Sequence, residues 1–186
     1  MPQPQSIVGK FDSARLARID AFVKERYLDT GLLPHAQVLV ARDGEIAHFS
    51  SQGAAREGGK AIDEASIFRI ASMTKPVTSV AFMMLVEEGK VALDTPVHHV
   101  LPEFKGLGVY NGGGAGVPFL TTPCERPMLM VDLLRHTSGL TYSFQNRGNI
   151  DAAMREGKME NWHGNLDLDE FIAALGKLPL EFSPGT

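Results

Sequence analysis

Residues 68–90 read FRIASMTKPVTSVAFMMLVEEGK, a long apolar run with a serine and a lysine near its start. Pro76 cannot donate a backbone hydrogen bond and clashes in a helix interior, so a helix that contains it must begin within about one turn before it. We therefore expect Ser72 at the helix N-terminus and Gly89 at the helix end. Residues three apart share a helix face, so the Lys75 amine is expected one turn from the Ser72 hydroxyl.

This pair has two interpretations. A lysine amine kept neutral by dry surroundings can take the proton of the serine hydroxyl and make its oxygen a nucleophile, helped by the positive N-terminal end of the helix. In the alternative, Ser72 caps the helix and the stem of Lys75 covers apolar surface while its amine reaches water. Chance alone gives about 0.4 such pairs in a chain with ten serines and eight lysines. The apolar run from Val77 to Leu85 favours the first interpretation, because it surrounds the lysine with core residues.

Composition excludes several classes of function. The chain has 186 residues, 44% of them hydrophobic and 22% charged, as is usual for a globular protein. Its net charge of -4 offers no basic surface, so no nucleic acid partner is expected. No apolar stretch reaches the length of a membrane span, and the first 20 residues lack the apolar core of a secretory signal. We therefore expect a cytoplasmic protein with no membrane partner.

No cofactor or metal is expected either. The single cysteine, Cys124, has no cysteine partner, and the six histidines are scattered along the chain. The NGGGAG stretch at residues 111–116 is not followed by the Gly-Lys-Ser/Thr of a phosphate-binding loop. These features predict a bystander thiol and a flexible glycine loop.

The rest of the chain alternates between helical and β patterns. Apolar residues at three- and four-residue steps predict a helix that begins at Asp12 or Ser13 and ends before Gly31. Two strands are expected at residues 36–42 and 45–50, joined by a tight Asp43-Gly44 turn. A short β-like run covers 67–70, a Gly- and Pro-rich surface excursion without regular structure covers 106–127, and further helices are expected at 130–136, 150–156 and 168–178.

So few strands make a marginal sheet. The pattern therefore predicts a mixed α/β (α+β) protein whose sheet needs strands that lie outside this sequence.

Three ordered blocks add to this reading. The first is SMTK, residues 72–75, framed as FRIASMTKPVTS and followed by LVEEGKVALDTPVHHVLPEF. The second is MVDLLRHTSGLTYSF, residues 130–144, and the third is FSPGT, residues 182–186. Together they resemble the serine β-lactamase and penicillin-binding-protein superfamily, and within it the class C-like esterases, often called family VIII carboxylesterases, which carry an LLxHTSGL segment and a PGT turn.

The resemblance implies roles for particular residues. Ser72 matches the acylated nucleophile and one oxyanion donor through its backbone amide, and Lys75 matches the general base. Tyr142 and Ser143 fall where this superfamily lines one wall of the substrate cleft, although both could equally be loop residues that pack locally. His136 belongs to the same block and is expected to be structural.

The resemblance also implies a β-lactamase-like fold that is incomplete. Residues 1–70 match the N-terminal helix and hairpin of its α/β domain, and residues 71–186 match the nucleophile helix and most of the helical domain. The tyrosine that follows the PGT turn, the third motif and the later strands are not in this sequence.

The leading functional hypothesis is a serine hydrolase that cleaves small carboxylic esters through an acyl-enzyme, with weak β-lactam turnover as a side activity. One alternative is a non-catalytic, truncated or split fragment that self-associates or associates with a missing C-terminal part, so that this chain alone has little or no activity. The other is a class C-like β-lactamase or D-alanyl-D-alanine peptidase, which the expected cytoplasmic location disfavours.

Overall fold

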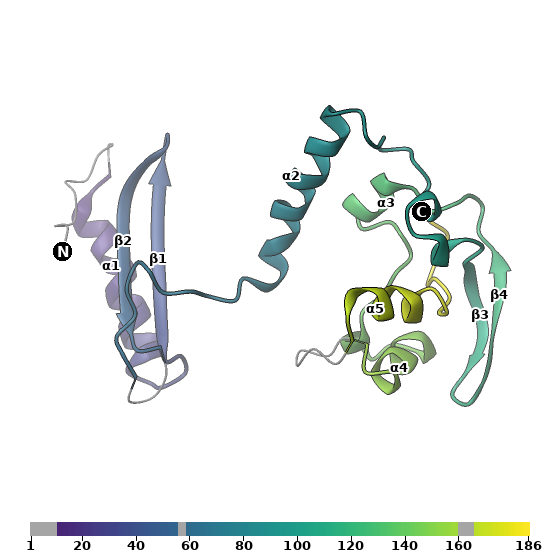
Figure 1. The fold of residues 1–186 in the computed structure, drawn as a ribbon. Helices are drawn as coiled ribbons and strands as arrows, with labels where there is room; N and C mark the ends of the chain where they lie inside the picture. Colours follow the sequence, from purple (N-terminus) through teal and green to yellow (C-terminus); the bar gives the residue numbers. More distant parts are fainter. Residues whose placement is uncertain (1–10, 56–58, 160–165) are drawn as a thin grey trace. The chain divides into compact units, whose positions relative to one another are not determined.

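A computed structural model describes residues 11–55, 59–159 and 166–186 of the chain (Figure 1). The chain divides into two compact units, Met1–Ala71 and Ser72–Thr186. The division lies one residue from the boundary expected from the sequence. The first ten residues of the expected first domain lie outside the described residues, and the assignment of the two units to an α/β and a helical domain stays a prediction.

The first unit begins with the expected helix. Helix α1 spans Ser13–Val23, and the Asp12 carboxylate caps it by accepting from the backbone N–H of Ala14 at 2.9 Å. A π-helical turn, Lys24–Leu28, continues α1 before Gly31 turns the chain with φ of +72°. The cap and the terminator read from the sequence are confirmed.

An antiparallel hairpin follows the helix. Strand β1, His35–Arg42, pairs with β2, Glu45–Gly53, through a turn in which Asp43 and Gly44 both have positive φ. The hairpin confirms the expected strands and extends the second by three residues. His48 of β2 contacts the Asp20 carboxylate of α1, with 3.1 Å between Nε2 and Oδ1, which ties the helix to the sheet.

The prediction of a short strand at residues 67–70 is wrong. This segment has no secondary structure, and Ile67 is 98% exposed. Both sheets found in the described residues have two strands, β1 with β2 and a second hairpin in the other unit. A run of β-prone residues becomes a strand only when it pairs with a partner, and this segment pairs with none of the described strands.

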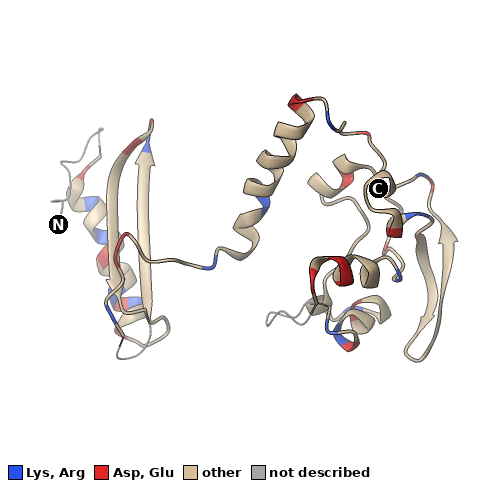
Figure 2. Cartoon of the chain, in the orientation of Figure 1, with Lys and Arg blue, Asp and Glu red and all other residues tan. Residues whose placement is uncertain are grey.

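The second unit begins with the helix that carries the Ser-x-x-Lys spacing. A 3₁₀ turn, Ala71–Met73, leads into α2, Thr74–Glu87, and Gly89 follows the helix with φ of +66°. Pro76 lies in the first turn of α2, as expected. Most of α2 carries neither acidic nor basic residues (Figure 2), yet none of its side chains is buried. Several large apolar ones are exposed: Val77, Val80, Met83, Met84 and Leu85.

The Gly- and Pro-rich segment at residues 106–127 is not the irregular excursion that we expected. It contains a second antiparallel hairpin of β3, Gly108–Gly114, and β4, Val117–Pro123. Gly113 lies at a bulge with φ of +79°, and a Cβ there would come within 2.1 Å of the Pro118 carbonyl oxygen. Glycine at this position therefore permits the strands to approach, rather than breaking them.

Three helices complete the second unit. They are α3, Met130–Leu134, α4, Asn149–Glu156, and α5, Leu168–Leu175, close to the expected positions but with α3 and α5 shorter at their ends. The core of this unit is rich in methionine, an unbranched side chain that fills irregular gaps. Its buried members are Val97, Phe104, Met128, Met130, Met154, Met159, Leu175 and Leu180.

None of the helices in the described residues has both the length and the apolar character needed to cross a bilayer.

Candidate active site

Ser72 and Lys75 meet at the start of α2. Lys75 Nζ donates to Ser72 Oγ over 3.0 Å. The contact arises because Ser72 lies in the 3₁₀ turn that opens the helix, three residues before the lysine on the same face. A hydrogen bond of this length is what proton transfer from a hydroxyl to an amine requires.

The backbone just before the serine is strained. Ala71 has φ of +43°, in the left-handed region that residues with a Cβ rarely adopt. Such residues cluster at active sites, where the surrounding structure holds them against a local cost. The strain places Ser72 on a sharp entry into the helix, a feature that the sequence did not reveal.

The surroundings of Lys75 differ from the expectation. The sequence predicts that the Lys75 amine lies among core residues. In the structure the Lys75 side chain is exposed, as are Val77 and Val80 on the same helix. Within the second unit taken by itself, the described residues leave this face of α2 exposed. The described residues of that unit therefore do not provide dry surroundings for the amine.

Tyr142 lies beside the Ser–Lys pair. Lys75 Nζ is 5.9 Å from the centroid of the Tyr142 ring, within the range of a cation–π contact. Ser143 begins a 3₁₀ turn, Ser143–Gln145, and its backbone carbonyl accepts from the Arg155 guanidinium. The structure thus brings Tyr142 to the candidate nucleophile and fixes Ser143 through its main chain.

An ion pair with a buried carboxylate lies in the same sequence block as Tyr142. Asp132 of α3 is only 2% exposed and accepts from Arg126 at 2.6 and 2.8 Å in a two-pronged contact, while the Leu129 backbone N–H donates to it at 2.8 Å. The guanidinium holds the pKa of Asp132 below its ordinary value in spite of burial, and the carboxylate raises the pKa of Arg126. His136 follows α3 with φ of +60°, and the structural role expected for it stays a prediction.

The second and third sequence blocks are packed together. The Gly185 backbone N–H donates to the Thr137 carbonyl and that of Glu181 to the Gly139 carbonyl, both at 2.8 Å. Gly139 has φ of +82°, and a Cβ there would come within 2.4 Å of the Phe182 carbonyl oxygen. The HTSGL and PGT segments therefore form one local structure, about forty-five residues apart in sequence.

Comparison with known protein families matches residues 19–186 to the family described as Beta-lactamase. The chain belongs to the beta-lactamase family. Esterase EstB from Burkholderia gladioli is 37% identical over 178 residues, which are 94% of this chain and 42% of EstB. The beta-lactamase-family chain thus spans about two fifths of the length of this curated relative.

Solved structures agree on the fold. EstCE1, a hydrolase with promiscuous acyltransferase activity, matches 93% of this beta-lactamase-family chain and 42% of its own, with a TM-score of 0.72 and 26% identity. Unliganded simvastatin synthase LovD from Aspergillus terreus matches 95% of this chain and 44% of its own, with a TM-score of 0.70 and 24% identity. The fold is therefore β-lactamase-like, and the chain covers only part of it, as the sequence indicated.

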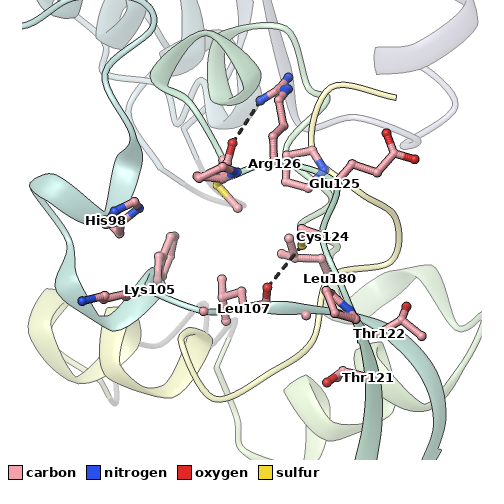
Figure 3. A pocket seen from close by; sticks show the side chains of 16 residues that line it. His98, Lys105, Leu107, Thr121, Thr122, Cys124, Glu125, Arg126 and Leu180 are labelled. Atoms are coloured by element: carbon pink, nitrogen blue, oxygen red, sulfur yellow. Dashed lines mark hydrogen bonds between the residues drawn. The ribbon is translucent and has the colours of Figure 1, made fainter.

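A pocket of about 640 Å³ in this beta-lactamase-family chain lies between the β3–β4 hairpin and two 3₁₀ turns that precede it, Val97–His99 and Pro102–Phe104 (Figure 3). None of the predicted site residues lines it. Cys124 does, and its thiol donates to the Leu107 carbonyl at 3.2 Å, while burial raises its pKa. A thiol held in its protonated form suits the bystander role expected for Cys124.

Three charged residues near the Tyr142 and Ser143 segment, Arg126, Asp132 and Asp151, were not predicted from the sequence. Asp132 lies in the first turn of α3, where an acidic side chain is favoured, and this was the one sequence signal that could have marked it. Asp151 lies in the first turn of α4 in the same way. Nothing in the sequence pairs Arg126 with Asp132, because a contact between a loop and a helix has no fixed spacing. No group of His, Cys, Asp and Glu side chains in the described residues is arranged to hold a metal ion.

Proposed function

We propose that this protein is a serine hydrolase that cleaves small carboxylic esters through an acyl-enzyme, with weak β-lactam turnover as a side activity. The observation that carries the proposal is the 3.0 Å hydrogen bond from Lys75 Nζ to Ser72 Oγ. Membership of the beta-lactamase family supports it, as does the name of the relative EstB, an esterase. The cytoplasmic location predicted from the sequence stays part of the proposal.

The proposed reaction has two halves. Ser72 Oγ attacks the ester carbonyl carbon while its proton passes to the neutral amine of Lys75, and the backbone N–H of Ser72 donates to the developing oxyanion. The tetrahedral intermediate collapses, the C–O bond to the alcohol breaks, and the alcohol leaves with that proton. A water molecule then attacks the acyl carbon and releases the carboxylic acid, which restores the serine hydroxyl.

The exposure of the Lys75 side chain affects the proton transfer from Ser72. Proton abstraction needs a dry, closely packed amine, whereas the Lys75 side chain is exposed to water. A cover over α2 would remove the water. We therefore propose that efficient turnover requires a further apolar surface on this helix, supplied by self-association or by the part of the fold that the relatives have and this chain does not span.

The test is hydrolysis of p-nitrophenyl acetate by the full-length gene product. Ser72→Ala removes the nucleophile, so its kcat/KM should fall by roughly 10³-fold or more. Ser79→Ala is the matched control, because it removes a hydroxyl from the same helix about two turns further on. It should keep the wild-type rate, and equal loss in both variants would contradict the assignment of Ser72.

The same preparation distinguishes the alternatives within the family. Hydrolysis of nitrocefin or of a peptide ending in D-alanyl-D-alanine at a higher kcat/KM than any simple ester would favour the β-lactamase or peptidase alternative. Preference for the ester supports the proposal, because the reaction then needs no recognition of a β-lactam ring or a peptide.

A further inference from the structure

We propose that Phe144 is a specificity-determining residue of this site, forming with Tyr142 an aromatic platform that binds the flat apolar acyl group of an ester. The inference rests on the proposed function and goes beyond it, because it names aryl-substituted acids such as phenylacetic acid as the preferred acyl class. Phe144 is the last residue of the second sequence block, but the resemblance assigned the cleft wall to Tyr142 and Ser143 and gave Phe144 no contact with substrate.

The platform is defined by two stacked rings, of which Tyr142 contacts Lys75, the partner of the nucleophile. The ring centroids of Tyr142 and Phe144 are 5.0 Å apart, and the ring planes differ by 21°. Lys75 links the rings to the reacting atom, since its Nζ is 5.9 Å from the Tyr142 centroid and 3.0 Å from Ser72 Oγ. One side of a substrate whose carbonyl reaches Ser72 therefore lies near these rings, and we assign the acyl group to that side.

Both rings remain accessible to a ligand. Tyr142 is 39% and Phe144 59% exposed. A large aromatic side chain that stays in contact with water gains when a flat apolar group covers it, and stacked ring pairs prefer parallel, offset partners. An acetyl group is too small to cover either ring, whereas a phenylacetyl group can cover one. The platform therefore discriminates by the shape of the acid.

The main chain under Phe144 is held on both sides. Arg155 of α4 donates to the Ser143 carbonyl and also to Asp151 Oδ2 at 3.3 Å. The Asn146 side-chain amide donates to the Phe144 carbonyl at 3.1 Å. With these carbonyls occupied, the segment cannot easily turn to bury the ring. The backbone that carries the exposed ring is thus held in advance, which lowers the entropy cost of binding.

Asp151 anchors this support. It is 1% exposed and accepts from the backbone N–H of Arg147 at 2.7 Å and of Gly148 at 2.9 Å. The Asp151 carboxylate accepts from the Arg155 guanidinium and so holds it where it can donate to the Ser143 carbonyl. We therefore regard Arg155 as a positioning residue for the platform.

The kinetic test compares methyl phenylacetate with methyl acetate, because neither has an aromatic leaving group that could bind the rings itself. In the full-length gene product, Phe144→Ala should lower the ratio of the two kcat/KM values by about tenfold. Phe144→Tyr keeps a ring and should keep the ratio. Leu120→Ala, which truncates an exposed apolar side chain on β4, is the control and should also keep it. An unchanged ratio in Phe144→Ala would overturn the inference.

A binding test separates this inference from the proposed function. Methyl phenylacetate is titrated against Ser72→Ala and against the double variant Ser72→Ala, Phe144→Ala, with NMR to follow the ligand and the fold. About tenfold weaker binding in the double variant supports the platform even if the wild-type protein hydrolyses no ester. Equal affinities, with both spectra folded, would refute it even if esters are hydrolysed.

Discussion

At the scale of single residues, the site depends on carboxylates that the structure buries and pairs. Asp132 and Asp151 are both almost completely buried, and each accepts backbone N–H groups and a guanidinium. Burial raises the pKa of Asp151, but the bonds from Arg147, Gly148 and Arg155 outweigh it and lower the pKa overall. A buried charge of this kind stabilises the fold only while its partners stay in place.

Acid should therefore weaken the second unit. Because the folded-state pKa of Asp132 is lowered, its contribution to the free energy of unfolding is complete above the unfolded pKa, near 3.9, and is lost as the pH falls through the folded pKa. Asp132→Asn should cost about 2 kcal/mol at pH 7 and much less at pH 2. Urea unfolding of the wild type and of Asp132→Asn at the two pH values measures this difference in the free energy of unfolding.

The control for that experiment is Asp94→Asn, which changes an exposed carboxylate in the same unit. Its unfolding free energy should match the wild type at both pH values, because surface substitutions away from such networks cost little. A loss at pH 7 that is the same for both variants, or a loss in Asp132→Asn that persists at pH 2, would show that the ion pair does not provide the pH dependence.

The sequence could identify some of these residues and not others. Ser72 and Lys75 were found because a helix fixes their spacing, and the structure brings them within hydrogen-bonding distance. Their catalytic roles stay predictions, as do the substrate contacts of Tyr142 and Ser143. Arg126 was missed because its partner lies across a loop. The burial predicted for Lys75 is wrong for the described residues, since an apolar helix shows which face needs a cover but not where the cover comes from.

At the scale of elements, the HTSGL segment and the PGT turn act as one structure. Two backbone hydrogen bonds join them, and Gly139 lies where they come closest. Ser183, just before the PGT turn, makes a contact with another segment, because its hydroxyl accepts from the Glu125 backbone N–H at 3.0 Å. The turn is thus held against the same loop that carries Arg126.

Glycine is required at this contact for two separate reasons. Gly139→Ala should lower the melting temperature through the strain of its positive φ and through the clash with the Phe182 carbonyl. Gly116→Ala shares the strain, with φ of +90°, but has open space around its Cβ. We expect Gly139→Ala to be more destabilising than Gly116→Ala by about 1 to 2 kcal/mol in thermal unfolding. Equal losses would mean that the two segments do not pack closely.

Element boundaries were predictable where short-range chemistry sets them. Asp43-Gly44 fixed the first hairpin, and Asp12 and Gly31 fixed the ends of the first helix. The second hairpin, β3 with β4, was missed because its glycines look like strand breakers, whereas they allow bulges and close approach. The prediction of a strand at residues 67–70 is wrong for the opposite reason: its composition fits a strand, but no described strand pairs with it.

At the scale of the whole molecule, apolar side chains remain uncovered in both units. Leu39 and Phe49 face each other across the first hairpin and are 55% and 38% exposed. On α2, Val77 and Val80 are each 64% exposed. Exposed apolar side chains on one strand pair or on one helix, as in each unit here, are typical of an interface. It agrees with a chain that spans about two fifths of its relatives.

The 186-residue chain should therefore self-associate. Light scattering should give a mass above that of a monomer, and Val77→Lys with Val80→Lys should shift it toward the monomer, because two charges would have to be buried at the interface. Leu168→Lys changes an exposed leucine on α5 and serves as the control, with no shift expected. A clean monomer at high concentration would count against the association.

The central claim is that Ser72 accepts the acyl group and that Lys75 activates it. Intact-mass spectrometry can follow the reaction of the full-length gene product with a serine-directed phosphonate, and peptide mapping can locate the adduct. We predict one adduct, on Ser72, and labelling slowed by about 10² to 10⁴-fold in Lys75→Met. An adduct on another residue, or labelling of Lys75→Met at the wild-type rate, would contradict the account.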